Sequence, residues 1–185
     1  MKDAENEHHK GVDFSNQDLS NQNFQDCTFE QCNFSYTNLT NCSFDTVTFI
    51  GCNLSCTNLQ NCKLQDIVFD SCKLVGTDLH TCVGAFGSLH FTFKNCVLNG
   101  CNFSALKLPK TKFASSQLES CIFNNSDLTE ASFSNTDLTN TLFHNCKLEK
   151  ADFSSARNYT IDPSNNKITK ARFSFPEAAT LLQFL

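Results

Sequence analysis

Twelve cysteines and five histidines are the residues of this 185-residue chain that could bind a metal or carry redox chemistry. Thiolates and imidazoles hold zinc when they converge in closely spaced pairs such as Cys-x2-Cys. The chain contains no such pair, and its histidines are scattered, with His8 and His9 in a polar stretch near the N-terminus. The spacing therefore predicts no metal site.

The cysteines follow a different positional rule. All but Cys56 lie two residues before a Phe or Leu, or, for Cys82, before Gly84 in the same register. Elsewhere Thr, Ser, Ala, Val or Ile occupies the same position, and a free cysteine behaves as a small hydrophobic residue. We therefore interpret these thiols as reduced core residues, which indicates a reducing compartment and predicts a cytoplasmic protein.

The Phe and Leu residues that follow these small positions recur every five residues. They occupy all 27 positions of two runs, from Phe14 to Leu79 and from Phe93 to Phe153. This period is neither the 3.6 of an α-helix nor the 2.0 of a flat strand. A fixed period along the chain indicates a repeat architecture, here with an inward pair of residues and a polar shell in every unit.

Composition limits the classes of protein that fit. The chain is 40% hydrophobic and 18% charged with a formal net charge of −5, so it can bury a core and lacks the basic surface of a nucleic-acid-binding protein. No apolar stretch approaches the length of a membrane span. The polar start of the sequence does not have the pattern of a signal peptide.

Several units carry a family resemblance. Cys32-Asn-Phe-Ser-Tyr, Thr57-Asn-Leu-Gln-Asn, Ser126-Asp-Leu-Thr-Glu and Ala151-Asp-Phe-Ser-Ser resemble the pentapeptide-repeat family, whose motif is roughly A(D/N)Lxx. The resemblance covers residues 12–173, with Cys or Thr often in place of Ala. It implies an all-β fold, a right-handed quadrilateral parallel β-helix with four units per coil, so that residues twenty apart stack.

The chain then divides into three parts. Residues 1–11 are expected to form a polar, mobile leader, residues 12–173 the β-helix, and residues 174–185 a short C-terminal capping helix. The β-helix has a register break at 83–92 and a loop at 154–167. Leu79 and Phe93 are 14 residues apart where 15 would keep the phase, so we interpret the break as a one-residue deletion absorbed as a kink. The alternative is a recognition site with an exposed Phe86.

The C-terminal segment is expected to cap the open end of the solenoid. On an α-helix, one stripe would rest on the last coil, namely Phe175, Ala178, Leu182 and Leu185. Leu181 and Phe184 would point away and leave a second apolar surface. We therefore predict a tail-to-tail homodimer with contact residues Leu181, Leu182, Phe184 and Leu185.

The sequence shows no catalytic constellation and no cofactor motif, so we expect a non-enzymatic protein that binds another protein. Within the resembled family, the quinolone-resistance proteins imitate B-DNA and bind DNA gyrase or topoisomerase IV, which lowers fluoroquinolone sensitivity. The resemblance implies that activity for this chain. The alternative is a structural or scaffold protein with a different protein partner.

The charge pattern supports the imitation of DNA on one half only. Residues 11–90 contain eight acidic residues against Lys63 and Lys73, whereas residues 91–172 contain ten basic residues against seven acidic ones. By the twenty-residue rule, a candidate acidic interaction surface extends over two neighbouring faces. Asp26, Asp45 and Asp66 share one face, and Glu30 and Asp70 lie on the next.

Overall fold

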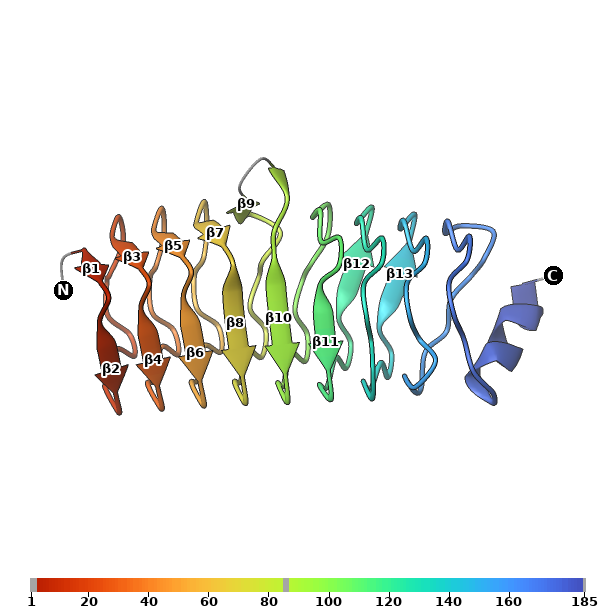
Figure 1. Ribbon diagram of the computed structural model, residues 1–185, viewed down its shortest axis with the longest axis horizontal. Helices are drawn as coiled ribbons and strands as arrows, with labels where there is room; N and C mark the ends of the chain where they lie inside the picture. The colour runs from red at the N-terminus through yellow and green to blue at the C-terminus, as the bar shows by residue number, and fades with distance from the viewer. Residues whose placement is uncertain (1–2, 85–86, 185) are drawn as a thin grey trace.

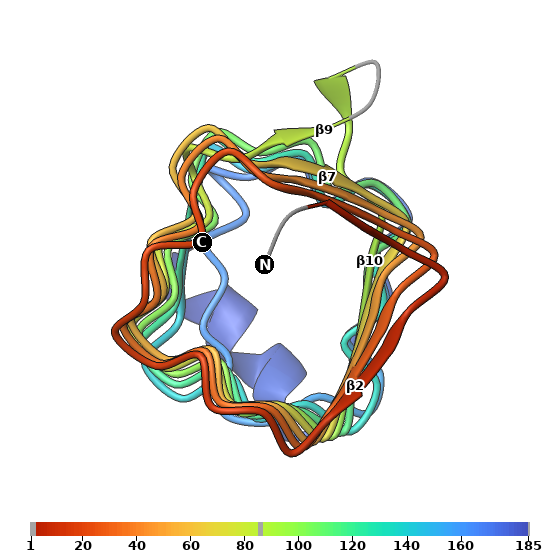
Figure 2. The same cartoon turned by 90° about the vertical axis from the view of Figure 1, so that its left-hand side faces the viewer.

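The computed structural model, which describes residues 3–84 and 87–184, is a four-sided parallel β-helix (Figures 1 and 2). Seen from its N-terminal end, the chain turns clockwise as it recedes, so the coil is right-handed (Figure 2). Along the rod the strands of each side lie next to one another in chain order (Figure 1). The predicted fold class is therefore confirmed.

Two of the four sides are parallel sheets in the first part of the rod and are held by single bridges beyond it. Face 1 carries the sheet β1-β3-β5-β7-β9, and face 2 carries β2-β4-β6-β8-β10-β11. The strands are short, as a five-residue unit requires. They are β1 (Ala4–Glu5), β2 (His8–Lys10), β3 (Asn23–Gln25), β4 (Thr28–Glu30), β5 (Ser43–Asp45), β6 (Thr48–Ile50), β7 (Lys63–Gln65), β8 (Ile67–Asp70), β9 (Val83–Gly84), β10 (Phe91–Lys94) and β11 (Lys112–Ala114).

The other two sides are held mainly by single bridges. Face 3 runs through bridges such as Asp13↔Asn33 and Asn33↔Asn53, and face 4 through Asp18↔Asn38 and Asn38↔Asn58. Toward the C-terminus, face 4 becomes a two-stranded sheet of β12 (Ile122–Asn124) and β13 (Leu142–His144). The bridges join residues twenty apart, as predicted, except across the break at 83–92.

Polar residues at the corners and before each buried centre make the turns. At the corners, residues such as Asn16, Asn41 and Asp26 adopt the left-handed conformation, with φ between 51° and 59°. Asn and Asp tolerate this conformation better than other L-residues. Before the centres on faces 3 and 4, an Asn or Asp carboxamide or carboxylate accepts the backbone N–H two residues later, as from Ser15 to Asp13 at 2.9 Å.

The core is an aromatic column on face 2 flanked by rows of Leu and Phe. Nine rings stack one above the next, with centroids 4.6–5.5 Å apart. They are His9, Phe29, Phe49, Phe69, Phe93, Phe113, Phe133, Phe153 and Phe173. Parallel stacking follows from the register, because each ring lies over the corresponding residue of the previous coil, twenty positions earlier or, for Phe93, 24, and spans the strand spacing.

The expected polar leader is wrong for its described residues. Ala4 is buried, and β1 and β2 pair in register with β3 and β4, so the first coil begins near residue 4. His9 stacks on Phe29 at 5.1 Å instead of lying in a solvated tail. The five-residue pattern of Phe and Leu missed this coil because Ala4 and His9 occupy its centres.

The small inward positions explain the cysteines. All twelve thiols are free, and all but Cys56 are buried. A thiol or hydroxyl at this position donates to the backbone carbonyl 23 residues earlier, as from Cys52 Sγ to Phe29 O at 3.2 Å and from Thr57 Oγ1 to Phe34 O at 2.8 Å. Cys and Thr therefore replace Ala at most of these positions without leaving a buried polar group unpaired; the exception is Thr111, whose Oγ1 is buried without a partner. Cys56 is an exposed corner residue with φ 54°.

The register break is an insertion of four residues, not a deletion of one. Val68 pairs with Thr92 and Asp78 with Asn102, a separation of 24 residues instead of twenty. The chain leaves the coil outline on either side of residues 85–86 (Figure 2). Gly84 pairs with Leu64 on face 1, and Leu89 is buried after it. Leu89 donates its N–H to Lys107 O at 2.8 Å, as the buried residues of face 1 do in later coils, so it connects this face to the next coil. Phe86 lies outside the described residues.

The last coil keeps the repeat through Arg157, which bridges to Asp137, and resumes it by Lys167, which bridges to Lys147. The predicted loop at 154–167 is therefore confined to about 158–165, and Ile168 and Phe173 then pack against the core. The capping segment then forms a 3₁₀ helix, η2 (Glu177–Phe184), not an α-helix. With three residues per turn, Leu181 packs on the core and Phe184 lies over the coil end, while Phe175 and Leu182 are exposed. The predicted faces of this helix are therefore wrong; Leu185 lies outside the described residues.

Candidate functional site

The described residues contain no group of three or more His, Cys, Asp or Glu side chains that could hold a metal ion. Cys62 and Cys121 are unsuited to nucleophilic chemistry, because burial raises the pKa of each thiol to about 12. None of the helical segments in the described chain has the length and hydrophobicity to cross a membrane. Two surface regions of the described residues are candidate functional sites.

The first is the acidic set of the N-terminal half. Asp45 follows the face 1 centre Phe44, and Asp26 and Asp66 form the corner between faces 1 and 2. Asp26 and Asp45 make no ion pair within the described residues, and Asp66 approaches only His90, whose Nδ1 is 3.8 Å away. The structure thus brings these three carboxylates together at one edge of the rod. We name Asp26, Asp45 and Asp66 the acidic corner.

Glu30 and Asp70 do not add free charge to the acidic corner. Both lie on face 2, where Lys10 Nζ is 2.6 Å from Glu30 Oε1 and Lys94 Nζ is 3.0 Å from Asp70 Oδ2. The hydrogen bond from Lys10 lowers the pKa of Glu30, and that from Lys94 lowers the pKa of Asp70. The predicted five-residue acidic face is therefore an unpaired corner beside two neutralised carboxylates.

The C-terminal half has more cations than anions but pairs them along the rod. Lys147, Lys150, Arg157 and Arg172 each reach an acidic residue twenty positions earlier. Asp137, one of these acids, shows the effect of such contacts. Burial alone would raise its pKa, but hydrogen bonds from Asn158, Thr139 and Arg157 lower the pKa to about 2. The two halves therefore present different electrostatics to a partner.

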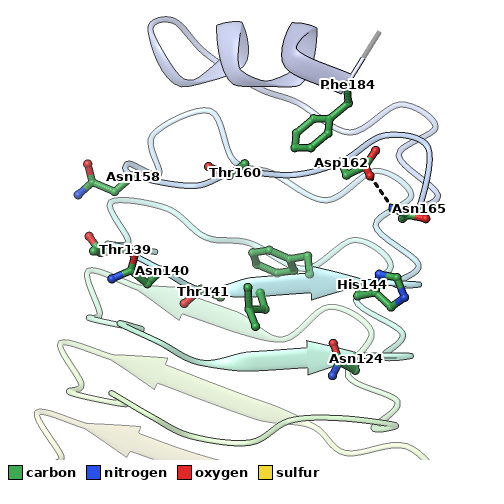
Figure 3. Close-up of a pocket in the computed structure, with 12 residues that line it drawn as sticks. Asn124, Thr139, Asn140, Thr141, His144, Asn158, Thr160, Asp162, Asn165 and Phe184 are labelled. Atoms are coloured by element: carbon green, nitrogen blue, oxygen red, sulfur yellow. Dashed lines mark hydrogen bonds between the residues drawn. The ribbon is translucent and has the colours of Figure 1, made fainter.

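A second candidate site was missed by sequence reasoning. A groove of about 890 Å³ lies on face 4 between β13 and η2 (Figure 3). Its lining combines amides, hydroxyls and apolar groups. The lining residues are Asn124, Thr139, Asn140, Thr141, Leu142, Phe143, His144, Asn158, Thr160, Asp162, Asn165 and Phe184. No motif signals it, because it exists only where the loop leaves the repeat.

Loop contacts hold one wall of this groove in place. Asn166 occupies a small inward position and donates to Phe143 O at 3.0 Å and to Asp162 O at 2.9 Å, while its Oδ1 accepts the Cys146 N–H at 2.9 Å. Asp162 accepts the backbone N–H of Ser164 at 2.8 Å and the Asn165 amide. Phe184 reaches down from η2 on the opposite side (Figure 3).

The four predicted dimer-contact residues have different environments. Leu181 packs on the core and Phe184 lines the groove, so neither points away from the coil as expected. Leu182 is 66% exposed, and Phe175, just before the helix, is 83% exposed. Leu185 lies outside the described residues. The exposed apolar surface of the cap away from the groove is therefore formed by Phe175 and Leu182, while Phe184 is 40% exposed beside the groove.

Comparison with known families covers most of the chain. A family model described as pentapeptide repeat region matches residues 4–79 and 22–103, and a second, pentapeptide repeats (8 copies), matches residues 92–125 and 126–157. No curated protein matches the sequence. The matches extend to residue 4, in agreement with the first coil of the structure.

Solved structures share the fold at low identity. HetL, a pentapeptide repeat protein involved in heterocyst differentiation regulation from the cyanobacterium Nostoc sp. strain PCC 7120, superposes with a TM-score of 0.76 at 16% identity, over 94% of this chain and 86% of HetL. A trypsin-treated variant of QnrB1, a plasmid-mediated fluoroquinolone resistance protein, gives a TM-score of 0.58 at 19% identity, over 98% and 96%.

Proposed function

This chain belongs to the pentapeptide-repeat family, and on that premise we propose that it is a non-enzymatic solenoid that binds a protein partner through its acid-rich N-terminal half. In this proposal the acidic half imitates B-DNA, and the partner is DNA gyrase or topoisomerase IV. The fold shared with QnrB1, a fluoroquinolone resistance protein, supports the choice of partner. Binding would lower fluoroquinolone sensitivity.

The observation that carries the proposal is the unequal pairing of acids along the rod. In the described residues, the acidic corner has no lysine or arginine partner, whereas Asp127, Glu130, Asp137 and Asp152 are each paired with a Lys or Arg. An unpaired row of carboxylates attracts the basic surface of a DNA-binding protein. The C-terminal half would contribute length and rigidity.

The acidic half has a lower density of negative charge along its axis than B-DNA. B-DNA carries one charge per ~1.7 Å, so a coil rise of ~4.8 Å corresponds to about three charges. Residues 11–90 contain eight acidic residues. Those 80 residues, which include the insertion, make about four coils, which gives about two acids per coil. We therefore expect association to weaken steeply with salt, but less steeply than for DNA itself.

A supercoiling assay tests the proposal. The protein should change gyrase supercoiling activity and its inhibition by a fluoroquinolone. Asp26→Asn, Asp45→Asn and Asp66→Asn combined should abolish the effect. The charge-matched control Glu119→Gln, Glu130→Gln and Glu149→Gln should retain it, because these residues lie on the other half. No effect of the unmutated protein on either topoisomerase would refute the proposed partner.

A second candidate function is that of a scaffold for a different protein partner. It is favoured by the spread of the remaining acids: Asp13 lies on face 3, and Asp18 and Asp78 lie on face 4, away from the acidic corner. Asp13 and Asp18 accept backbone N–H bonds that shape turns. Backbone and side-chain hydrogen bonds from Ser15 lower the pKa of Asp13, and side-chain and backbone hydrogen bonds from Ser20 lower that of Asp18. Loss of function in both triple variants, or in neither, would favour this candidate.

We also propose that the protein works as a homodimer in the cytoplasm. The exposed Phe175 and Leu182 at the end of the rod form an apolar surface that a two-fold contact would bury. The eleven buried thiols, all free, support a reducing compartment.

A further inference from the structure

The last coil of the solenoid is closed on faces 1 and 2 but open on face 4. On face 1, Leu148 N donates to Lys167 O, and on face 2, Phe153 N donates to Arg172 O, both at 2.8 Å. On face 4, β13 pairs with β12, and the described residues contain no strand on its other edge. The groove lies along this open edge of β13.

The backbone groups left open at this edge of β13 correspond to those that β12, in the preceding coil, uses to bond β13. There, Asn125 N donates to His144 O at 2.9 Å, and Cys121 O accepts from Leu142 N at 2.9 Å. Twenty residues later, the corresponding groups are the N–H of Asn145 and the carbonyl of Thr141, together with the N–H of Phe143. Within residues 3–84 and 87–184, none of these three has a backbone partner.

The chain itself cannot supply the missing strand. The position twenty residues after Phe143 is Pro163, which has no N–H to donate and is excluded from the interior of a sheet. The chain instead passes the edge through Thr160 and Asp162, which line the far wall of the groove. Phe184 from η2 covers the groove and is itself 40% exposed.

We propose that this groove binds an extended peptide segment of a partner protein, which adds to β13 as a further strand. A peptide is favoured over other ligands because its backbone presents N–H and C=O groups at the spacing of the open edge. This site lies at the opposite end from the acidic corner and does not depend on the function proposed above.

The neighbouring strands indicate which side chains the peptide carries. β12 reads Ile122-Phe123-Asn124 and β13 reads Leu142-Phe143-His144, so each strand has an outward aliphatic, an inward aromatic and an outward polar residue. A bound peptide of the same pattern would place its aromatic ring between Phe143 and Phe184. Its aliphatic residue would cover Leu142, which is 59% exposed.

A synthetic peptide that copies residues 139–145, Thr-Asn-Thr-Leu-Phe-His-Asn, provides the probe. Fluorescence anisotropy should show saturable binding, and a scrambled peptide should not bind. Phe184→Ala should weaken binding about tenfold or more, as expected for an aromatic anchor. Tyr36→Ala, a matched change of an exposed aromatic residue outside the groove and the cap, should leave affinity unchanged.

Amide hydrogen exchange supplies a second readout. In the free protein, the amides of Phe143 and Asn145 should exchange much faster than those of Phe123 and Asn125, and the peptide should slow them. Equal binding of the scrambled peptide, or unchanged exchange of both amides with the peptide at saturation, would overturn the proposal. So would protection that grows with protein concentration without peptide, because a second copy would then fill the groove.

Discussion

At the residue scale, one small inward position explains most of the unusual composition. A thiol or hydroxyl there is buried and donates to a carbonyl of the previous coil, so Cys42 bonds Leu19 O at 3.1 Å and Thr37 bonds Phe14 O at 2.8 Å. Burial raises the pKa of Cys42, which suppresses the reactive thiolate form. Twelve cysteines in one chain are therefore compatible with a chemically inert interior.

This position predicts a selective reactivity. In the native protein, a maleimide should label Cys56 rapidly and the other eleven thiols only after unfolding, because Cys56 alone is exposed. The measurement is mass spectrometry of the intact protein against labelling time. A Cys56→Ser variant should show no rapid addition. Fast native addition of several labels would mean that the small positions open frequently.

At the element scale, the five-residue repeat determines which features of the fold could be predicted from the sequence. The period and the small position follow from the spacing of Phe, Leu and Cys, whereas the stacking every twenty residues was implied by the family resemblance. The structure confirms all three. The first coil was missed because Ala4 and His9 replace the large centres. The insertion at 83–92 was misread because, with a period of five, adding four residues and removing one give the same phase.

The sites depended on features that a period does not show. The acidic corner was predicted as part of a larger set, but stacking by coil could not reveal that Lys10 and Lys94 neutralise Glu30 and Asp70. The inward and outward residues of the cap were predicted with the 3.6-residue period of an α-helix. Because η2 is a 3₁₀ helix with three residues per turn, other residues face the coil than those predicted. The groove is lined by residues of the loop, such as Asn158, Thr160 and Asp162, which do not follow the five-residue pattern. The pattern therefore could not predict it.

The unit also predicts how a single charge affects stability. Leu118 is a fully buried centre on face 3. Leu118→Asp should lower the free energy of unfolding by at least about 4 kcal/mol, since it removes a core side chain and buries a carboxylate without a partner. The measurement is a urea titration followed by circular dichroism. Gln117→Asp, at the adjacent exposed position, should be nearly neutral; an equal loss in both variants would contradict the inward assignment.

At the scale of the whole molecule, the rod has two different ends. The N-terminal half carries the acidic corner, whereas the C-terminal end carries the groove and the exposed Phe175 and Leu182. A dimer through the cap would place the two acidic halves at the outer ends of one long rod. Such a rod resembles a short stretch of duplex more than a single copy does.

The dimer has a direct test in solution. Light scattering should give twice the 20.7 kDa chain mass for the unmutated protein. Phe175→Glu with Leu182→Glu should give a folded monomer, because charges at the contact oppose burial. Tyr36→Glu with Ile50→Glu, which changes exposed apolar residues far from the cap, should remain dimeric. A monomeric unmutated protein would contradict the dimer.

The central claim, that the acidic half occupies a DNA-binding surface, is tested most directly by competition. Gyrase is bound to a fluorescent linear duplex, the protein is titrated in, and the anisotropy of the DNA is followed at several salt concentrations. We predict displacement of the DNA, weaker at higher salt, by the unmutated protein and not by the variant that lacks Asp26, Asp45 and Asp66. Gyrase that holds DNA and this protein together, or that binds DNA unchanged at saturating protein, would contradict the claim.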